Sequence, residues 1–250
     1  MNGLDRVLIT FFNLPLIRDT LSQIVRIGFR NTLVLAVLAI AAGLLIGIVV
    51  SLGLLSTRRW LRIPSRVYVD IFRGLPSILT IYLLGEGLPL AGLDVFAGNT
   101  YGYAALALGM IEGAYIAEIL RAGIQSVDRG QGEAARSLGL SGAQAMRLVV
   151  FPQGVRRVLP PLAGQFIIVT KATALVYLLG LTASQREMFA IGQDMSVNNA
   201  SLSPLIAVGL SYLALTVPLT YLVNRLDRRL RVGPRQTMRT APARLVQDLG

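Results

Sequence analysis

Long apolar runs alternate with short arginine-rich segments along this chain of 250 residues. About 20 mostly apolar residues cross the hydrocarbon core of a bilayer as an α-helix. Five runs approach that length, and the predicted spans are residues 32–55, 67–84, 101–120, 159–181 and 205–223. The first run carries Gly43, Gly47 and Gly53, which allow another helix to approach closely. The pattern predicts an all-α membrane protein with five transmembrane helices.

The segments outside these runs divide the chain further. Residues 14–30 carry four charged side chains, too many for a sixth span. We therefore expect residues 1–31 to form an amphipathic segment along the membrane interface. Residues 32–230 are the expected transmembrane domain, and residues 231–250 a basic, disordered cytoplasmic tail. The N-terminus lacks the layout of a signal peptide and is expected to stay uncleaved.

Arginine is distributed unequally among the segments that join the spans. Residues 56–66, 121–158 and 224–235 are rich in arginine, whereas residues 85–100 hold two acidic residues and no basic one. Arginine and lysine are enriched in cytoplasmic loops. The three arginine-rich segments are therefore predicted to be cytoplasmic, in a multi-pass protein of the cytoplasmic membrane whose N-terminus lies outside.

Composition narrows the possible function classes. Hydrophobic residues make up 54% of the chain and charged residues 15%, against roughly 25% charged residues in soluble domains. The mean hydropathy is +0.62. The net charge of +11 comes almost entirely from arginine between apolar runs, which argues against a nucleic-acid-binding face. The absence of cysteine and histidine disfavours a metal site, a hydrolytic enzyme or an integral-membrane enzyme, and no cofactor is expected.

One polar interruption, residues 133–152, reads EAARSLGLSGAQAMRLVVFP. Its first six residues are predicted to form a short helix that begins at Glu133. Gly139 would supply the left-handed conformation that closes this helix, and Pro152 would stop the next apolar helix from continuing backwards. Such a short helix is marginal in water and needs a second surface. The alternative is that Glu133 only places a negative charge at a helix N-terminus.

This interruption resembles the EAA loop of ABC-importer permeases. The likeness rests on Glu133, Ala134, Ala135, Gly139 and the apolar ending at Pro152. In that family the loop is a coupling helix that docks into a groove on a cytoplasmic ATPase subunit. These five residues are therefore the expected coupling site.

Further motifs are similar to those of permeases of polar amino acid importers. They are AYIAEILRAGIQSV at residues 114–127, PQGVRRVLPPL at residues 152–162 and RGLP at residues 73–76. The likeness covers about residues 31–230. It implies a permease that works by alternating access with a homodimer of ABC ATPase subunits, a second permease (a copy or a sibling) and an extracytoplasmic substrate-binding protein.

Other functions stay open at this point. The chain has no phosphate-binding loop, so ATP hydrolysis is expected on a separate chain and no catalytic residue is assigned here. The first alternative is an importer permease for another small solute, such as an opine or an osmolyte. The second is an ATP-independent secondary transporter, which the coupling loop and the absence of an inverted repeat disfavour.

Two charged residues are expected deep in the membrane. Glu112 lies nine residues from Arg121, and Lys171 lies eleven residues from Pro160, which is roughly 13 Å and 16 Å at 1.5 Å per residue. They could form a structural pair, or they could line a substrate pathway together with Thr173. The hydroxyl of Thr173 could equally bond a backbone carbonyl.

The residue after Lys171 bears on the substrate. Relatives often carry Asp or Asn there, whereas this chain has Ala172. No carboxylate is then available at that point for a cationic side chain, which makes a basic amino acid a less favoured substrate.

Two more charge pairs lie near the predicted cytoplasmic ends of spans. Asp70 and Arg73 are three residues apart, as are Glu118 and Arg121. Residues with this spacing are neighbours on a helix surface. We expect both to be structural ion pairs rather than substrate contacts.

Overall fold

Helices α3 (Phe29–Leu55) and α7 (Thr100–Gln125) form the seam around which the rest of the chain packs. The computed structural model describes residue 7 and residues 9–231, and this part of the chain is helical with no strand. A Cβ atom on Gly43 would lie 2.7 Å from Cβ of Glu112, and one on Gly47 would lie 2.7 Å from Cγ2 of Ile116. Because such contacts are too short for real carbon atoms, the close approach of the two helices at these two points requires glycine.

Four helical stretches of the described residues are long and apolar enough to cross a membrane. They are Ile9–Leu55, Thr100–Gln125, Gly142–Leu179 and Ser203–Leu230. The third comprises α9 (Gly142–Ala145), η2 (Met146–Val150), α10 (Phe151–Ala172) and η3 (Thr173–Leu179). The fourth corresponds to α12 (Ser203–Arg231). The all-α membrane fold predicted from the pattern is confirmed, with four or five spans.

The count of five depends on a broken helix. The expected span at residues 67–84 is divided into α4 (Arg59–Gly74) and α5 (Ser77–Gly85), and the pair is bent by 106°. Leu75 has an extended backbone with ψ 142° because Pro76 follows it and disfavours the helical conformation. The second predicted span is therefore a bent pair of helices. A short turn, α6 (Gly87–Leu90), follows α5.

The N-terminal helix runs into the first span without a break. Helix α2 (Leu14–Gln23) passes through a π-helical turn, η1 (Ile24–Gly28), directly into α3, so no change of structure marks the expected boundary at residue 31. The backbone N–H of Asn13 donates to Oγ of Ser203 at 2.9 Å, which ties the start of α2 to the start of α12.

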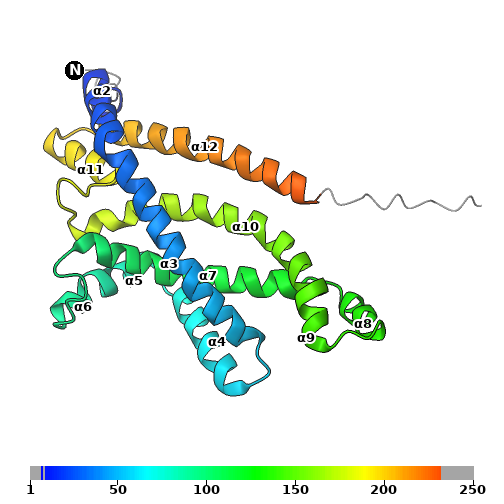
Figure 1. Ribbon diagram of the computed structural model, residues 1–250. Coiled ribbons are helices and arrows are strands. Elements are labelled where there is room, and N and C mark those ends of the chain that lie inside the picture. Colours follow the sequence, from blue (N-terminus) through cyan, green and yellow to red (C-terminus); the bar gives the residue numbers. More distant parts are fainter. Residues whose placement is uncertain (1–6, 8, 232–250) are drawn as a thin grey trace, which may run out of the picture.

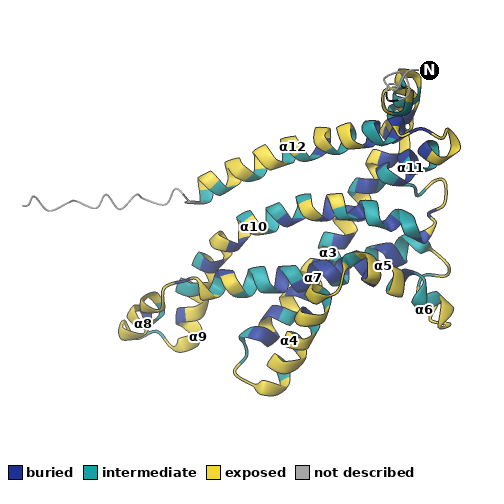
Figure 2. Ribbon diagram, turned by 180° about the vertical axis from the view of Figure 1, so that it is seen from behind, coloured by how far each residue is buried: buried dark blue, intermediate teal, exposed yellow. Residues whose placement is uncertain are grey.

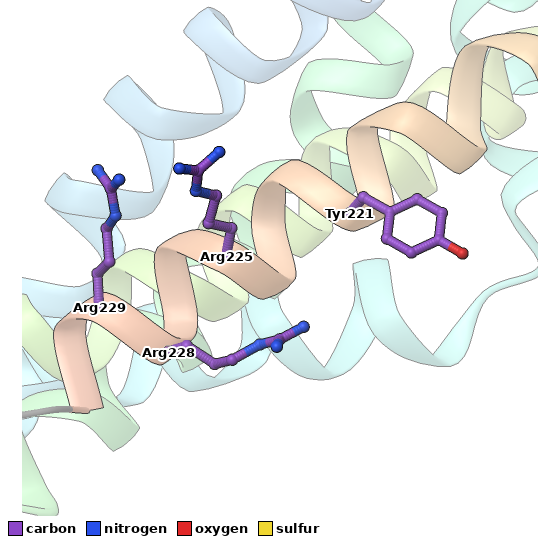
Figure 3. Close-up of a pocket in the computed structure, with 4 residues that line it drawn as sticks. All are labelled: Tyr221, Arg225, Arg228 and Arg229. Atoms are coloured by element: carbon purple, nitrogen blue, oxygen red, sulfur yellow. The ribbon is translucent and has the colours of Figure 1, made fainter.

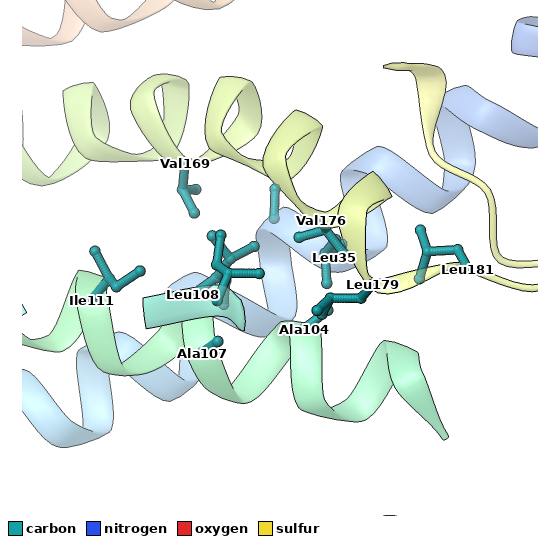
Figure 4. Packing of buried hydrophobic residues seen from close by; sticks show 12 residues of the cluster. Leu35, Ala104, Ala107, Leu108, Ile111, Val169, Val176, Leu179 and Leu181 are labelled. Carbon is teal, nitrogen blue, oxygen red and sulfur yellow. The ribbon is translucent and has the colours of Figure 1, made fainter. Parts of the chain in front are cut away.

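The main hydrophobic cluster lies where α3, α7, α10 and η3 meet. Leu35, Leu108, Val169, Val176 and Leu179 interlock in this cluster (Figure 4). Figure 2 shows that burial concentrates on α3 and α7, while α4 and α12 expose most of their surface. In the most apolar stretch of α12, only 11% of the residues are buried against the rest of the chain.

The two ends of the bundle differ in what they present. Helix α8 (Arg129–Ser137), α9, the turn from α3 to α4 and the last turns of α12 lie at one end (Figure 1). The N-terminal helix, α6 and α11 (Met188–Asn198) lie at the other end. The expected tail, residues 231–250, lies outside the described residues apart from the helical backbone of residue 231.

Candidate functional site

Helix α8 carries the polar motif found in the sequence. It begins at Arg129, earlier than expected, because the carboxylate of Asp128 accepts a hydrogen bond from the backbone N–H of Gly130 at 2.6 Å and caps the helix. Glu133 therefore sits inside the helix, one turn after its start, and the alternative that it provides the N-terminal charge is wrong. The glycines at positions 130 and 132 lower helix propensity and concealed this start.

The C-terminus of α8 closes in a Schellman motif. Gly139 has φ 89°, and its N–H donates to the carbonyl of Arg136 at 3.0 Å. The N–H of Leu140 donates to the carbonyl of Ala135 at 3.2 Å. These are the two bonds that define this motif, and the left-handed residue in it is most often glycine. Gly139 thus holds the turn that ends α8.

Much of the surface of α8 is left without a partner in the described chain. Ala135 is buried, whereas Glu133, Ala134 and Leu138 are exposed, and Leu138 is 86% exposed. Glu133 and Arg136 line grooves on both sides of the helix, against α7 and η2 and against the Gly139 turn. The exposed face of α8 thus carries Leu138 together with the charged residues Glu133 and Arg136.

Pro152 does not stop the helix that follows. A π-helical turn, η2, precedes it, and the N–H of Phe151 donates to the carbonyl of Met146. The wider turn lets the chain stay helical past a residue that has no N–H, so Pro152 sits in the first turn of α10. The predicted interruption is therefore wrong, since residues 142–179 form one helical stretch.

Of the two expected ion pairs, the structure forms one. Oε2 of Glu118 lies 2.5 Å from Nη2 of Arg121, and Oε1 lies 3.5 Å from Nη1 of Arg66 on α4. Glu118 thus links α7 to α4. Asp70 is exposed and does not join Arg73, whose guanidinium carbon lies 5.4 Å from the centroid of the Tyr115 ring. The aromatic face on α7 takes the place of the expected carboxylate.

Glu112 and Lys171 are not brought together. Glu112 is 2% exposed, and its Oε2 accepts a hydrogen bond from Nε2 of Gln165 at 2.7 Å. Lys171 follows Gln165 by six residues on α10, which places the two side chains roughly 120° apart around the helix. The expected pairing fails because the two side chains lie on different faces of α10.

Lys171 instead contributes to a pocket between α10, α11 and α12. This pocket has a volume of about 370 Å³, and its lining residues are Lys171, Ala174, Phe189, Leu205, Val208, Gly209 and Tyr212. The hydroxyl of the fully buried Thr173 donates to the carbonyl of Thr170 at 2.8 Å. Thr173 therefore uses its hydroxyl locally, and the exposed Lys171 is one of the residues that line a mostly apolar pocket.

Sequence reasoning did not single out Glu187 or Tyr212. Glu187 is fully buried at the N-terminus of α11, and its carboxylate accepts hydrogen bonds from the N–H groups of Phe189 and Ala190 and from the hydroxyl of Tyr212. Burial raises the pKa of Glu187 to about 7, and the three donors oppose that shift. A glutamate directly before an apolar helix was the available signal.

A basic cluster marks the last turns of α12. Arg225 and Arg229 extend to the same side of the helix, and Tyr221 lies one turn before Arg225 (Figure 3). With Arg228 they line a shallow surface pocket. An arginine cluster that follows an interfacial tyrosine is typical of the end of a membrane span.

These features define a multi-pass membrane protein that presents a short polar helix at one end of its bundle. Residues 39–232 match the family described as binding-protein-dependent transport system inner membrane component. The chain belongs to this family. Among the described residues, no group of His, Cys, Asp or Glu side chains could hold a metal ion.

Individual relatives are permeases by name. The chain is 37% identical over 205 residues to the probable glutamine ABC transporter permease protein GlnM of Bacillus subtilis, which covers 81% of this chain and 91% of the relative. It is 34% identical to the arginine transport system permease protein ArtQ of the same organism, over 82% of this chain and 91% of the relative. It is 32% identical to the glutamine transport system permease protein GlnP of Escherichia coli, over 82% of this chain and 92% of the relative.

Solved structures share the fold. A crystal structure of an amino acid ABC transporter with histidines matches with a TM-score of 0.74 at 30% identity, covering 92% of this chain and 99% of that chain. The inward-facing MetNI methionine ABC transporter matches with a TM-score of 0.68 at 19% identity, covering 83% of this chain and 96% of that chain. At that lower identity the likeness concerns the fold alone.

Proposed function

We propose that this chain is the membrane-spanning permease subunit of an ATP-driven importer that carries a polar amino acid by alternating access. The observation that carries the proposal is α8, a capped helix closed by Gly139 that exposes Glu133, Ala134 and Leu138 at one end of the bundle. A helix of this length gains stability from a second surface. The groove of an ATPase subunit would supply that surface, with Glu133, Ala134, Ala135, Gly139 and Pro152 as the coupling segment.

The partners follow from this placement. ATP hydrolysis belongs to a homodimer of separate ATPase subunits, and a second permease, a copy or a sibling, completes the membrane part. An extracytoplasmic binding protein delivers the substrate to the opposite end, near α6 and α11. Closure of the ATPase subunits would push the two copies of α8 together and rock the spans from inward-open to outward-open.

The orientation of the chain is supported by its charges. The turn from α3 to α4, the α8 region and the last turns of α12 lie at one end of the bundle (Figure 1), and each is rich in arginine. That end would be cytoplasmic under the rule for basic loops. The N-terminus would then lie outside, and the amphipathic residues 14–30 would lie at the outer membrane interface.

The substrate pathway is assigned to the Lys171 pocket. An ammonium group with apolar and aromatic neighbours can bind the carboxylate of an amino acid while the wall accommodates its side chain. Thr173 supports the backbone beneath this pocket. Glu112 is sealed between Gly43 and Gln165, so we assign it to the packing of α7 and not to the pathway.

The substrate is assigned to the neutral or acidic amino acids. Relatives are named for glutamine, arginine and glutamate. Ala172 offers no carboxylate for a cationic side chain, and Lys171 is the one charged residue among those that line the described pocket. Glutamine and glutamate therefore fit the described residues better than arginine.

Transport by the reconstituted complex tests this function. The chain would be purified with the ATPase and binding protein encoded beside it, and placed in proteoliposomes that contain ATP. Uptake of labelled glutamine or glutamate should require both enclosed ATP and external binding protein. Uptake driven by an ion gradient without the ATPase would overturn the proposal, and a preference for arginine would overturn the substrate assignment.

A further inference from the structure

Glu187 is a buried carboxylate that the proposed transport cycle does not yet use. It is 0% exposed, yet it lies in the segment that joins η3 to α11, outside the long helices. An isolated carboxylate in such a place is costly unless hydrogen-bond donors surround it. Here two backbone N–H groups and one phenol donate to its two oxygens. In an ordinary helix cap, the side chain accepts hydrogen bonds from backbone N–H groups alone. Here the hydroxyl of Tyr212 is an additional donor.

Tyr212 connects this cap to three other elements. Its hydroxyl donates to Oε2 of Glu187 at 3.1 Å, and the side chains of Thr173 on η3 and Thr32 on α3 lie close enough to interact with it. Oγ1 of Thr32 also accepts the N–H of Met188 at 3.1 Å. Helices α3, η3, α11 and α12 therefore meet at one polar junction.

The ring of Tyr212 also forms part of the wall of the Lys171 pocket. Tyr212 and Lys171 line this pocket together with Phe189, which follows Glu187 by two residues. The Phe189 ring packs edge-on against Tyr177 at 5.2 Å. The carboxylate thus bonds to two residues of the wall: to the backbone N–H of Phe189 and to the side-chain hydroxyl of Tyr212.

We propose that Glu187 is a positioning residue for the Lys171 pocket: by accepting the Tyr212 hydroxyl it holds the aromatic wall that selects the substrate side chain. This proposal rests on the proposed function for its transport consequence, but the position of the wall does not depend on it. Released from Glu187, the Tyr212 ring could turn away and widen the pocket next to Ala174.

The first test measures the wall directly. The chain has no cysteine, so Ala174→Cys in the pocket lining provides a unique thiol whose reaction rate with a small methanethiosulfonate reagent reports access. Tyr212→Phe and Glu187→Gln in the assembled complex should each raise that rate several-fold. Tyr103→Phe is the matched control, since the Tyr103 hydroxyl also holds a carboxylate, Asp94, but away from the pocket.

The double variant shows whether the two residues act through one bond. If they do, combining Glu187→Gln with Tyr212→Phe should raise the labelling rate no further than either change alone. Tyr212→Phe keeps the ring and loses only the hydroxyl, so it remains informative if Glu187→Gln assembles poorly. An unchanged labelling rate in assembled Tyr212→Phe would overturn the positioning role.

The second test measures selectivity. In proteoliposomes, both single variants should change the ratio of the KM for glutamine to the KM for glutamate by the same factor, at least threefold, while Tyr103→Phe leaves the ratio unchanged. Faster labelling with an unaltered ratio would overturn the selective role. If the parent carries none of the amino acids tested, the proposed function fails, whereas the labelling result still decides the position of Tyr212.

Discussion

Nε2 of Gln165 on α10 donates a hydrogen bond to Oε2 of Glu112 on α7 at 2.7 Å, in a contact closed off from the surroundings. Glu112 packs at the same time against Gly43 of α3. This single bond therefore links α10 to the seam between α3 and α7. It also gives a carboxylate deep in the bundle a partner that carries no charge.

Removing this amide should destabilise the protein. Gln165→Leu leaves the Glu112 carboxylate without its donor, and an unsatisfied buried polar group costs about 1–3 kcal/mol, more when it is charged. The thermal unfolding temperature of the purified protein should fall clearly. Gln153→Leu on the same helix is the control, because its bond to Gln131 is exposed and 3.4 Å long, and it should leave the temperature nearly unchanged.

The absence of a bond between Glu112 and Lys171 makes a prediction about additivity. Residues that share no contact contribute independently to stability, within about 0.3–0.5 kcal/mol. The effects of Glu112→Gln and Lys171→Met on the free energy of unfolding should therefore add in the double variant. A coupling above about 1 kcal/mol, measured by a double-mutant cycle, would contradict the separation of the two faces of α10.

Gly139 should be required for coupling rather than for membrane assembly. A residue with a Cβ atom at φ 89° costs about 1–2 kcal/mol in the left-handed region. Gly139→Ala should loosen the turn after α8 and reduce the ATP hydrolysis that loaded binding protein stimulates. The matched control is Gly142→Ala, at a glycine with open space and no positive φ, which should keep full stimulation.

Glu118, which forms an ion pair on α7, should contribute more to stability than Asp70, which forms no ion pair with Arg73 on α4. Glu118 is held by Arg121 and Arg66, and hydrogen bonds to charged groups contribute about 1.5–3 kcal/mol. Partial exposure of Arg66 reduces its share. Glu118→Gln should lower the unfolding temperature, whereas Asp70→Asn, at an exposed position, should change stability by less than about 0.5 kcal/mol. Equal effects of the two changes would contradict this difference.

Glu187 should make stability depend on pH. Its folded-state pKa is raised from 4.5 to about 7, so between these values the folded chain keeps a proton that the unfolded chain has lost. The stabilisation is fully present below pH 4.5, falls as the pH rises towards 7 and is absent above it, a change on the order of 3 kcal/mol. The difference in unfolding temperature between the parent and Glu187→Gln should follow that curve. A difference that does not vary between pH 5 and 8 would contradict it.

The sequence was sufficient where a signal is local or periodic. Apolar length predicted the membrane helices, and Gly139 predicted a left-handed helix end because few other residues adopt that conformation. The bend before Pro76 could also have been read, since the residue before a proline avoids the helical region. The start of α8 was harder to predict, because Asp128 and Glu133 are both plausible residues for a helix N-terminus.

The sequence did not reveal which buried side chains contact each other, because these contacts depend on how the helices are rotated relative to one another. Glu112 and Lys171 were expected at similar depths, but the rotation of α10 about its axis brings Gln165 to Glu112 instead. The π-helical turn before Pro152, which lets the helix continue past the proline, is a geometry that helix propensities do not encode. The junction at Glu187 joins it to Tyr212, 25 positions away, and to Thr32, 155 positions away, so no local pattern predicts it.

The glycine seam between α3 and α7 has a mechanical consequence. Gly109 and Gly113 on α7 face Ala42 and Ile46 on α3, just as Gly43 and Gly47 face α7. A Cβ atom at any of these four glycines would lie 2.7 Å from a side-chain carbon of the facing helix, so the two helices cannot slide along each other without such clashes. The two helices should therefore move as one rigid body during transport. The hinges would then lie at the contacts with α12 and at the break between α4 and α5.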